Sequence, residues 1–343
     1  MSLMAAVDPH GDPGARSLPH VDYAAHPAYG GMFQPHRKRG LVVAAQLQPF
    51  IEEVEQAERE RRARFGFHHG AGTGISREIS AQGFCVRQLE PELLDPLHQV
   101  AAPLVAEIQA RIAALKASGE PVSFKASQEA VLPDRHGEIW SQAAETVKRA
   151  GLVAASSDYF GAPGAKLKAA AVMVNQPGQA WCNNLFTDLG LETPPTVGMH
   201  IDSSTYCTMK VVLYLNDVGP EQGPFGIIPT SHLWDQGGID RIRRRAYDRS
   251  QMVSRAFGKR RDFACLPTEL QVKAEFGGDL LPGAPDTEAL LAAERVLTGA
   301  RGQLNLFDPE AIHRGGHAQQ GERQVMLLSV AARLPRLSGE GAP

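Results

Sequence analysis

The sequence predicts a mainly β fold with flanking α-helices, in the form of a double-stranded β-helix (a jelly roll, cupin-like). Short apolar segments, several of them alternating with polar residues and separated by Gly- and Pro-rich turns, fill the second half of the chain, as in antiparallel sandwiches. No repeated strand–helix–strand pattern occurs, so a doubly wound parallel sheet is not expected. The predicted strands are a segment that begins at 199 and the ranges 166–175, 211–217, 226–232, 302–307 and 323–333.

Helical periodicity precedes these strands. Apolar residues recur at helical spacing over 90–116, and Pro91 stands where the first turn of a helix tolerates proline. A second helix is predicted over 137–151, and both helices would pack on one face of a sheet. Residues 49–65 carry acidic side chains first and basic ones last, which suits the dipole of a solvated surface helix.

Composition limits the class of protein. The chain has 343 residues, a net charge of −3 and 43% hydrophobic residues, which is typical of a globular protein. No apolar run reaches the roughly 18 residues that cross a bilayer, and the near-neutral charge provides no general attraction to nucleic acid. Four scattered cysteines without a CxxC spacing indicate neither a zinc site nor a disulfide framework, so we expect reduced thiols and a cytoplasmic protein. Neither a membrane nor a nucleic acid is expected as a partner.

The pattern divides the chain into an arm, one domain and a tail. The arm is rich in Pro, Gly and His without a sustained period, so it is predicted to be extended or partly disordered. The expected boundaries are 1–45 for the arm, 46–335 for a single domain with its β-helix core at about 166–335 and a lid-like insert at 233–300, and 336–343 for the tail.

The insert contains a basic stretch. Residues 241–261 hold nine Arg or Lys against one acid, Asp248. One interpretation is a solvated basic helix, and the other is a lid that attracts an anionic small-molecule substrate. Nucleic-acid binding is less expected, because no aromatic residues alternate with the basic ones to stack on bases. A capped surface helix is predicted over 285–297.

A candidate metal site begins with His200 and Asp202. Alternate side chains of a strand leave the same face, so this imidazole and this carboxylate point into one space. His313 stands in a second strand-like pattern. Two imidazoles and one carboxylate on one face of a metal suit non-haem Fe(II) that activates O2. His232 and His317 are rivals, and we expect His232 to order a turn.

Arg323 is the candidate for binding an organic co-substrate. It lies ten positions after His313, and a planar guanidinium is the natural bidentate partner of a carboxylate. A molecule that chelates iron with one end and reaches this arginine with a distant carboxylate would be 2-oxoglutarate. Arg301 and Arg314 are weaker alternatives, since Arg314 would face away from His313 in a strand.

Five segments in order resemble the phytanoyl-CoA dioxygenase family. They are the HxD of His200 and Asp202, YLNDV at 214–218, GPFGIIPTSH at 223–232, His313 with Arg323, and the strand-then-helix opening GFCVRQLEPELLDPL at 83–97. The resemblance covers about 83–335. It implies a double-stranded β-helix, Fe(II) held by His200, Asp202 and His313, and 2-oxoglutarate and O2 as co-substrates. It also implies that a substrate C–H is hydroxylated while succinate and CO2 are released.

Further donors are expected around the co-substrate. We expect 2-oxoglutarate to be bound by Lys168, Thr208 and Ser329 beside Arg323, and the substrate pocket to draw on Asn175, Gln176, Trp181 and Tyr214. Two other classes remain open. One is a cupin-like metal enzyme that does not use 2-oxoglutarate, and the other is a non-catalytic metal- or ligand-binding protein on the same fold.

Overall fold

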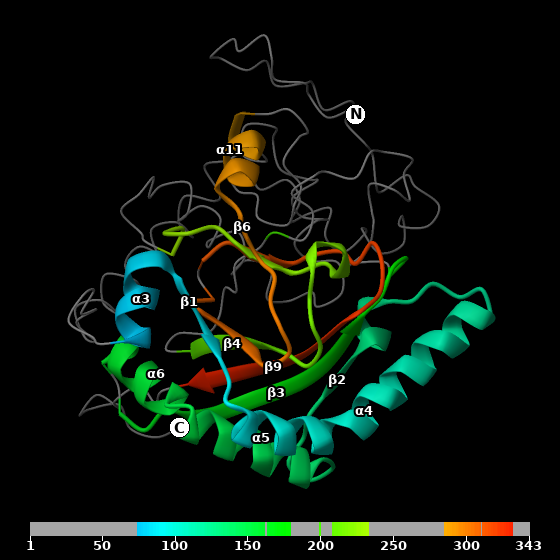
Figure 1. The fold of residues 1–343 in the computed structure, drawn as a ribbon, viewed down its shortest axis with the longest axis horizontal. Helices are drawn as coiled ribbons and strands as arrows, with labels where there is room; N and C mark the ends of the chain where they lie inside the picture. The colour runs from blue at the N-terminus through cyan, green and yellow to red at the C-terminus, as the bar shows by residue number, and fades with distance from the viewer. Residues whose placement is uncertain are drawn as a thin grey trace, which may run out of the picture. The chain divides into compact units, whose positions relative to one another are not determined.

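The computed structural model describes part of the chain in detail (Figure 1). The described residues are 74–161, 163–179, 199, 208–232, 285–309 and 311–331. The predicted arm 1–45, the helix at 49–65, the basic stretch 241–261 and the tail 336–343 lie outside them.

The chain divides into two compact units. One comprises Met1–Arg61, Asn183–Ser204 and Trp234–Glu294, and its described helix is α11 (Pro285–Ala293). The other comprises Arg62–Cys182, Thr205–Leu233 and Arg295–Pro343, and it contains all the elements described below. The division of the sequence into an arm, one domain and a tail stays a prediction.

Helices and short connecting elements form the first half of the second unit. They are α3 (Ile75–Gln82), β1 (Phe84–Gln88), α4 (Pro91–Ala117), the 3-10 turn η1 (Phe124–Ser127), β2 (Gln128–Ala130), α5 (Gly137–Arg149) and α6 (Leu152–Phe160). Pro91 occupies the first turn of α4, where its missing N–H costs no helical hydrogen bond. The predicted helices at 90–116 and 137–151 are thus confirmed almost to the residue.

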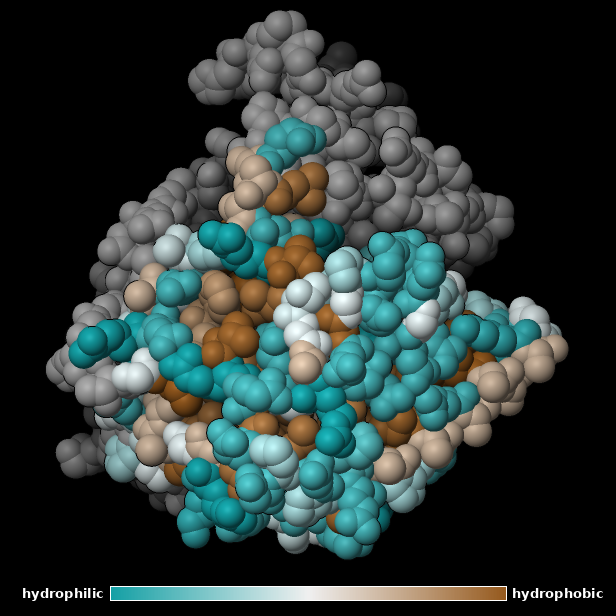
Figure 2. Space-filling model, viewed as in Figure 1, coloured by the Kyte–Doolittle hydropathy of each residue, from teal (hydrophilic) through white to brown (hydrophobic). Residues whose placement is uncertain are grey.

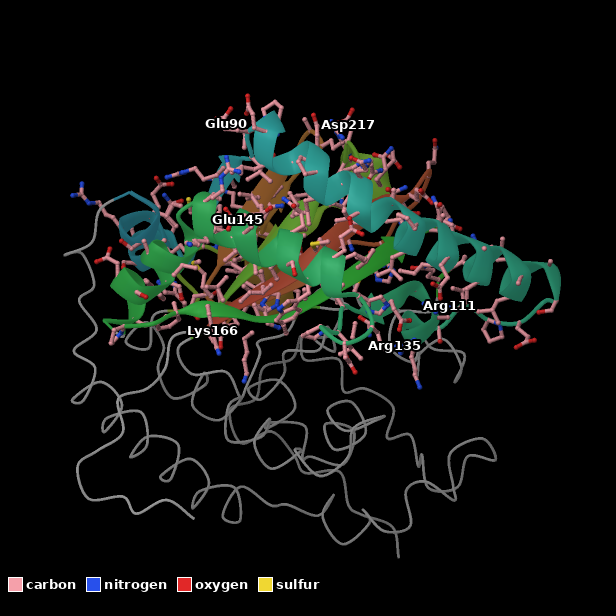
Figure 3. All side chains as sticks on the ribbon, turned by 90° about the horizontal axis from the view of Figure 1, so that it is seen from below. Glu90, Arg111, Arg135, Glu145, Lys166 and Asp217 are labelled. Atoms are coloured by element: carbon pink, nitrogen blue, oxygen red, sulfur yellow. The ribbon has the colours of Figure 1, made fainter. Side chains whose placement is uncertain are left out.

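The helical layer covers one face of a large sheet. Both α4 and α5 pack against β3 (Lys166–Asn175), as Figures 1 and 3 show. Leu97, Leu104 and Ile108 recur on one side of α4 and are fully or almost fully buried. Arg111 reaches from α4 to the edge of the sheet, where it forms an ion pair with Glu129 of β2 at 3.2 Å (Figure 3). Among the described helices, none combines the length and the apolar content that crossing a membrane would require.

The large sheet is antiparallel and has six strands in the order β1-β7-β4-β9-β3-β2. Its remaining members are β4 (Thr208–Tyr214), β7 (Gln303–Phe307) and β9 (Arg323–Ala331). A second, three-stranded sheet has the order β6-β5-β8, with β5 (Phe225–Ile227), β6 (Arg295–Leu297) and β8 (His313–Gly315). A 3-10 turn, η2 (Pro220–Gln222), leads into β5.

The strands pair in a nested order, which confirms the predicted jelly roll. β5 pairs with its successor β6, β4 pairs with β7 outside them, and β3 pairs with β9 outside both. The chain crosses repeatedly between the sheets, because β3, β4, β7 and β9 belong to the large sheet while β5, β6 and β8 belong to the small one. Residues far apart in sequence therefore meet between the two sheets. The fold is a mainly β, double-stranded β-helix with flanking helices.

Two predicted elements differ. The strand expected over 226–232 ends at Ile227, and residues 229–232 form a turn. The helix expected over 285–297 ends at Ala293, and Arg295–Leu297 form strand β6 instead. Pairing with β5 decides this conformation, because Arg295 faces Ile227 across the two strands.

The described residues include two apolar cores. The larger lies between the large sheet and the helices and includes Met209, Val211 and Leu213 of β4. The smaller lies between the two sheets and includes Val212 and Tyr214 of the same strand. Alternate residues of β4 thus face opposite cores. We call the side that faces the small sheet the inner face. Most of the described surface visible in Figure 2 is hydrophilic.

Candidate functional site

The inner face of the large sheet carries polar side chains at both ends and apolar ones between them. At one end Arg323 of β9 lies opposite Asn175 of β3. At the other end Ser329 of β9 lies opposite Lys210 of β4. Apolar pairs such as Met173 and Val325 separate the two ends. The jelly roll therefore places one arginine deep in the inner core.

Arg323 is almost completely buried, with 2% of its surface exposed. Its Nη2 donates to Oδ1 of Asn175 at 2.9 Å, and its Nη1 donates to the carbonyl oxygen of Gly223. Its Nε has no hydrogen-bond partner among the described residues. No carboxylate within the described ranges forms an ion pair with it.

Burial lowers the pKa of Arg323 to about 10, and nearby Tyr214 offsets only a small part of this effect. The guanidinium stays protonated at neutral pH, so it is a buried positive charge whose described contacts are neutral oxygens. Such a charge is costly in a protein interior unless an anion approaches it. The unused Nε–H supplies a donor for that anion.

Gly223, whose carbonyl oxygen accepts from Arg323, lies in a close contact between two loops, and this contact fixes the position of the carbonyl. Gly223 has a φ of +69°, and a Cβ there would lie 2.5 to 2.6 Å from backbone atoms of Gly316, His317 and Ala318. The N–H of Gly316 donates to the carbonyl of Pro224 at 3.0 Å in the same contact. Only glycine at 223 allows the two loops to approach this closely.

His313 begins β8 and faces the same inner core. It pairs with Ile227 of β5, and its ring packs 4.6 Å from that of Phe307 and 5.8 Å from that of Phe225, measured between centroids. Its Nδ1 lies 2.8 Å from the carbonyl oxygen of Ala311. A carbonyl only accepts, so Nδ1 carries the proton and Nε2 holds the lone pair. This is the tautomer of a histidine that binds a metal through Nε2.

The other two proposed ligands, His200 and Asp202, lie outside the described residues, as does the pocket candidate Trp181. Within the described ranges no three His, Cys, Asp or Glu side chains are grouped closely enough to hold a metal. The triad of His200, Asp202 and His313 therefore stays a prediction.

The rivals of these residues have other contacts. Nε2 of His232 lies 3.1 Å from the carbonyl oxygen of Ser80, and its ring packs against Gly83, so it orders a turn as expected. Arg301 forms an ion pair with Asp95 at 2.9 Å. Arg314 lies opposite Gly226 in the small sheet and is half-buried.

Thr208, Ser329 and Lys168 do not lie beside Arg323. Ser329 is six residues further along β9, on the inner face as its parity predicted. Lys168 is seven residues from Asn175 at an irregularity of β3, and its side chain is exposed. Thr208 lies near Ser329 at the same end of the sheet, opposite Ala331. At about 3.3 Å per residue these positions are about 20 to 26 Å from Arg323, so they cannot share a carboxylate with it.

Tyr214 and Gln176 are engaged in the framework around Arg323. The hydroxyl of Tyr214 donates to the carbonyl of Leu297 at 2.6 Å and accepts from the N–H of Phe225 at 2.9 Å. Burial raises the pKa of this phenol, and the phenol is fully buried. The side chain of Gln176 donates to Glu322 at 2.9 Å.

Sequence reasoning missed Lys210, although its spacing was available. It lies two residues after Thr208 and therefore on the same inner face, opposite Phe307, whose ring packs against His313. The Gly223 carbonyl was also missed, because a backbone contact across 100 residues leaves no residue-type signal.

Comparisons with known proteins found similarity only to solved structures, at low sequence identity. No family model matches the sequence, and no curated protein matches it. Similar solved structures include AviO1 from Streptomyces viridochromogenes Tue57, which is 13% identical, with 78% of this chain and 96% of that chain covered and a TM-score of 0.41. A second is the non-heme alpha ketoglutarate dependent carbocyclase SnoK from nogalamycin biosynthesis, with 15% identity, 76% and 88% coverage and a TM-score of 0.45.

A third is EctD from S. alaskensis with 2-oxoglutarate and 5-hydroxyectoine, which has 14% identity, 75% and 74% coverage and a TM-score of 0.42. At these identities and scores, the activities of those proteins do not transfer to this chain.

Proposed function

We propose that this protein is a non-haem Fe(II)- and 2-oxoglutarate-dependent dioxygenase that hydroxylates an unactivated C–H bond of a small organic substrate. The single observation that carries the proposal is Arg323. It is a buried cation on the inner face of a jelly roll, with an Nε that has no partner in the described part of the chain. A small dicarboxylic acid is the kind of molecule that supplies the missing anion.

The donor set fits Fe(II) at the other end of that acid. His313 presents an imidazole whose proton is fixed on Nδ1 by the Ala311 carbonyl. His200 and Asp202 would complete a facial set of two imidazoles and one carboxylate, which leaves the opposite positions of the metal open. Phe307 and Phe225 pack around the His313 ring and exclude water from that side.

The iron centre supplies the oxidising chemistry when it is bound: R–H, 2-oxoglutarate and O2 give R–OH, succinate and CO2. The chain's own residues bind and orient the reactants. Arg323 binds the distal carboxylate of 2-oxoglutarate. The buried surroundings strengthen the arginine–carboxylate attraction, because the local dielectric is low.

The chain's resemblance to the phytanoyl-CoA dioxygenase family supports the same reaction class through motifs that include His313 and Arg323. We propose an anionic small molecule as the substrate, since the stretch 241–261 is strongly basic. We also propose a cytoplasmic location, because scattered cysteines without a disulfide pattern suit a reducing compartment.

Turnover of the co-substrate tests the proposal without knowledge of the substrate. Purified protein is supplied with Fe(II), 2-oxoglutarate and O2, alone and with a panel of small organic acids, and succinate is measured by mass spectrometry. We expect succinate only when all three components are present, and none with His313→Ala. His98→Ala, in helix α4, is the matched control and should behave as the parent protein.

Two outcomes contradict the proposal. Oxygen consumption that needs iron but proceeds without 2-oxoglutarate would favour a cupin-like metal enzyme of another reaction type. Metal binding without oxygen consumption across the panel would favour a non-catalytic binding protein.

A further inference from the structure

Resting on the proposed function, we infer that Asn175 is a positioning residue that selects a dicarboxylate. Its neutral amide orients Arg323 without cancelling the positive charge, while the neighbouring carboxylate of Glu322 is held away from the guanidinium. The charge of Arg323 therefore remains available to a co-substrate with a second carboxylate.

Asn175 is buried, like Arg323, and its side-chain amide is hydrogen-bonded at both ends. It is 1% exposed, and its Oδ1 accepts from Nη2 of Arg323 at 2.9 Å. Its Nδ2 donates to Oε1 of Gln179 at 3.2 Å, and Nε2 of Gln179 donates to the carbonyl of Val174 at 3.0 Å. This relay fixes which end of the Asn175 amide faces Arg323, because the nitrogen has its own acceptor.

Glu322 is the residue next to Arg323, yet its carboxylate does not approach the guanidinium. Three amide groups donate to it: Nε2 of Gln109 at 2.6 Å, Nε2 of Gln176 at 2.9 Å, and Nε2 of Gln324. Successive residues of a strand face opposite sides, which points Glu322 away from the inner face.

The glutamines that bind Glu322 are themselves anchored. Gln109 belongs to α4, and Oε1 of Gln176 accepts from Nζ of Lys116 of the same helix at 2.9 Å. The backbone of Glu322 is fixed as well, because its carbonyl accepts from the side chain of Asn216 at 2.9 Å. The carboxylate is thus satisfied on the helix side of the sheet by neutral donors.

These contacts indicate that residue 175 has to be uncharged. Among the described residues, the hydrogen-bond partners of the Arg323 guanidinium are the Gly223 carbonyl and the Asn175 amide, and neither carries charge. A carboxylate at 175 would sit at 2.9 Å and form an internal ion pair. The distal carboxylate of an incoming acid would then meet a neutralised arginine and the added negative charge.

The test compares 2-oxoglutarate with 2-oxopentanoate, which has the same chain length and chelating end but lacks the distal carboxylate. Both are titrated by calorimetry into protein loaded with Mn(II), which does not turn over, and the ratio of the two dissociation constants is recorded. We expect the parent protein to prefer 2-oxoglutarate by about 100-fold, the scale of a buried charge pair.

Asn175→Asp should reduce this ratio to below about 3-fold while leaving the affinity for 2-oxopentanoate unchanged. Asn175→Ala removes the acceptor without adding charge and should reduce the ratio by about 10-fold, since one hydrogen bond to a charged group is lost. Gln99→Glu is the matched control. It adds the same charge at an exposed position of α4 and should keep the ratio of the parent protein.

The inference is overturned if Asn175→Asp, or Asn175→Ala should the first variant not fold, retains the ratio of the parent protein. A parent protein that binds both acids equally would instead contradict the proposed function. The two failures are therefore distinguishable.

Discussion

Replacing Arg323 with methionine tests whether Arg323 binds a ligand or stabilises the fold. Methionine fills much of the same space without charge or donors. The variant loses the contacts to Asn175 and Gly223, and it also removes a cation from the protein interior.

The two effects oppose each other in the free energy of unfolding. The drop in the pKa of Arg323 from 12.5 to about 10 corresponds to about 3 kcal/mol by which burial disfavours the charged form. Against this, two oxygen acceptors lose their donors, at about 1 to 2 kcal/mol each. The net change should stay within about 2 kcal/mol in the absence of ligand. In the parent protein, 2-oxoglutarate at a concentration 100 times Kd should raise the free energy of unfolding by about 2.7 kcal/mol. In the variant this stabilisation should disappear.

Chemical denaturation of Mn(II)-loaded protein, with and without 2-oxoglutarate, measures both quantities. Arg111→Met is the control: it breaks a half-exposed ion pair with Glu129 and should retain the ligand-dependent stabilisation. A loss of about 3 to 5 kcal/mol by Arg323→Met without ligand would refute the reasoning. That is the cost of breaking a buried pair that is already complete, and it would mean that the chain supplies the carboxylate itself.

Three further predictions follow from described contacts. Tyr214→Phe removes the hydroxyl between the Phe225 N–H and the Leu297 carbonyl, so it should cost about 1 to 3 kcal/mol in thermal or urea unfolding, and an unchanged midpoint would contradict that role. Gly223→Ala should be more damaging than a surface Gly→Ala change, with loss of 2-oxoglutarate binding, because its Cβ would meet facing backbone atoms at 2.5 Å. Burial raises the pKa of Cys85 from 9.0 to about 12, so the Cys85 peptide should stay unalkylated by iodoacetamide at pH 8.5 in the native protein. The same rise in the pKa of Cys85 lowers the free energy of unfolding as the pH increases above about 9, because the thiol of the unfolded chain loses its proton before that of the folded chain. Rapid alkylation of the native protein would contradict both statements.

Local patterns predicted the elements whose conformation local forces decide. The α4 helix has an apolar face and a proline in its first turn, and β3 runs over the predicted range 166–175. The strand β6 was missed, because Arg295–Leu297 have no strand pattern of their own and become extended only by pairing with β5. The periodicity of a segment does not reveal that it pairs with a strand distant in the sequence.

The same distinction explains the site. Alternation correctly placed Ser329 on the inner face with Arg323, since parity tells which face a strand residue occupies. Parity does not tell how far along the strand two residues are separated, so Ser329 and Lys168 were expected to bind 2-oxoglutarate beside Arg323, although they lie about 20 Å from Arg323 along the sheet. The contact between Asn175 and Arg323 depends on a register across 148 residues, which only the folded sheet defines.

The measurement that tests the central claim most directly is an anaerobic titration of metal-free protein, first with Fe(II) and then with 2-oxoglutarate. A chelated 2-oxoacid on Fe(II) gives a visible charge-transfer band. We predict that the band appears in the parent protein, is absent in His313→Ala, and needs far more 2-oxoglutarate in Arg323→Met. Absence of the band from fully iron-loaded parent protein would contradict the account and favour a metal enzyme that does not use 2-oxoglutarate.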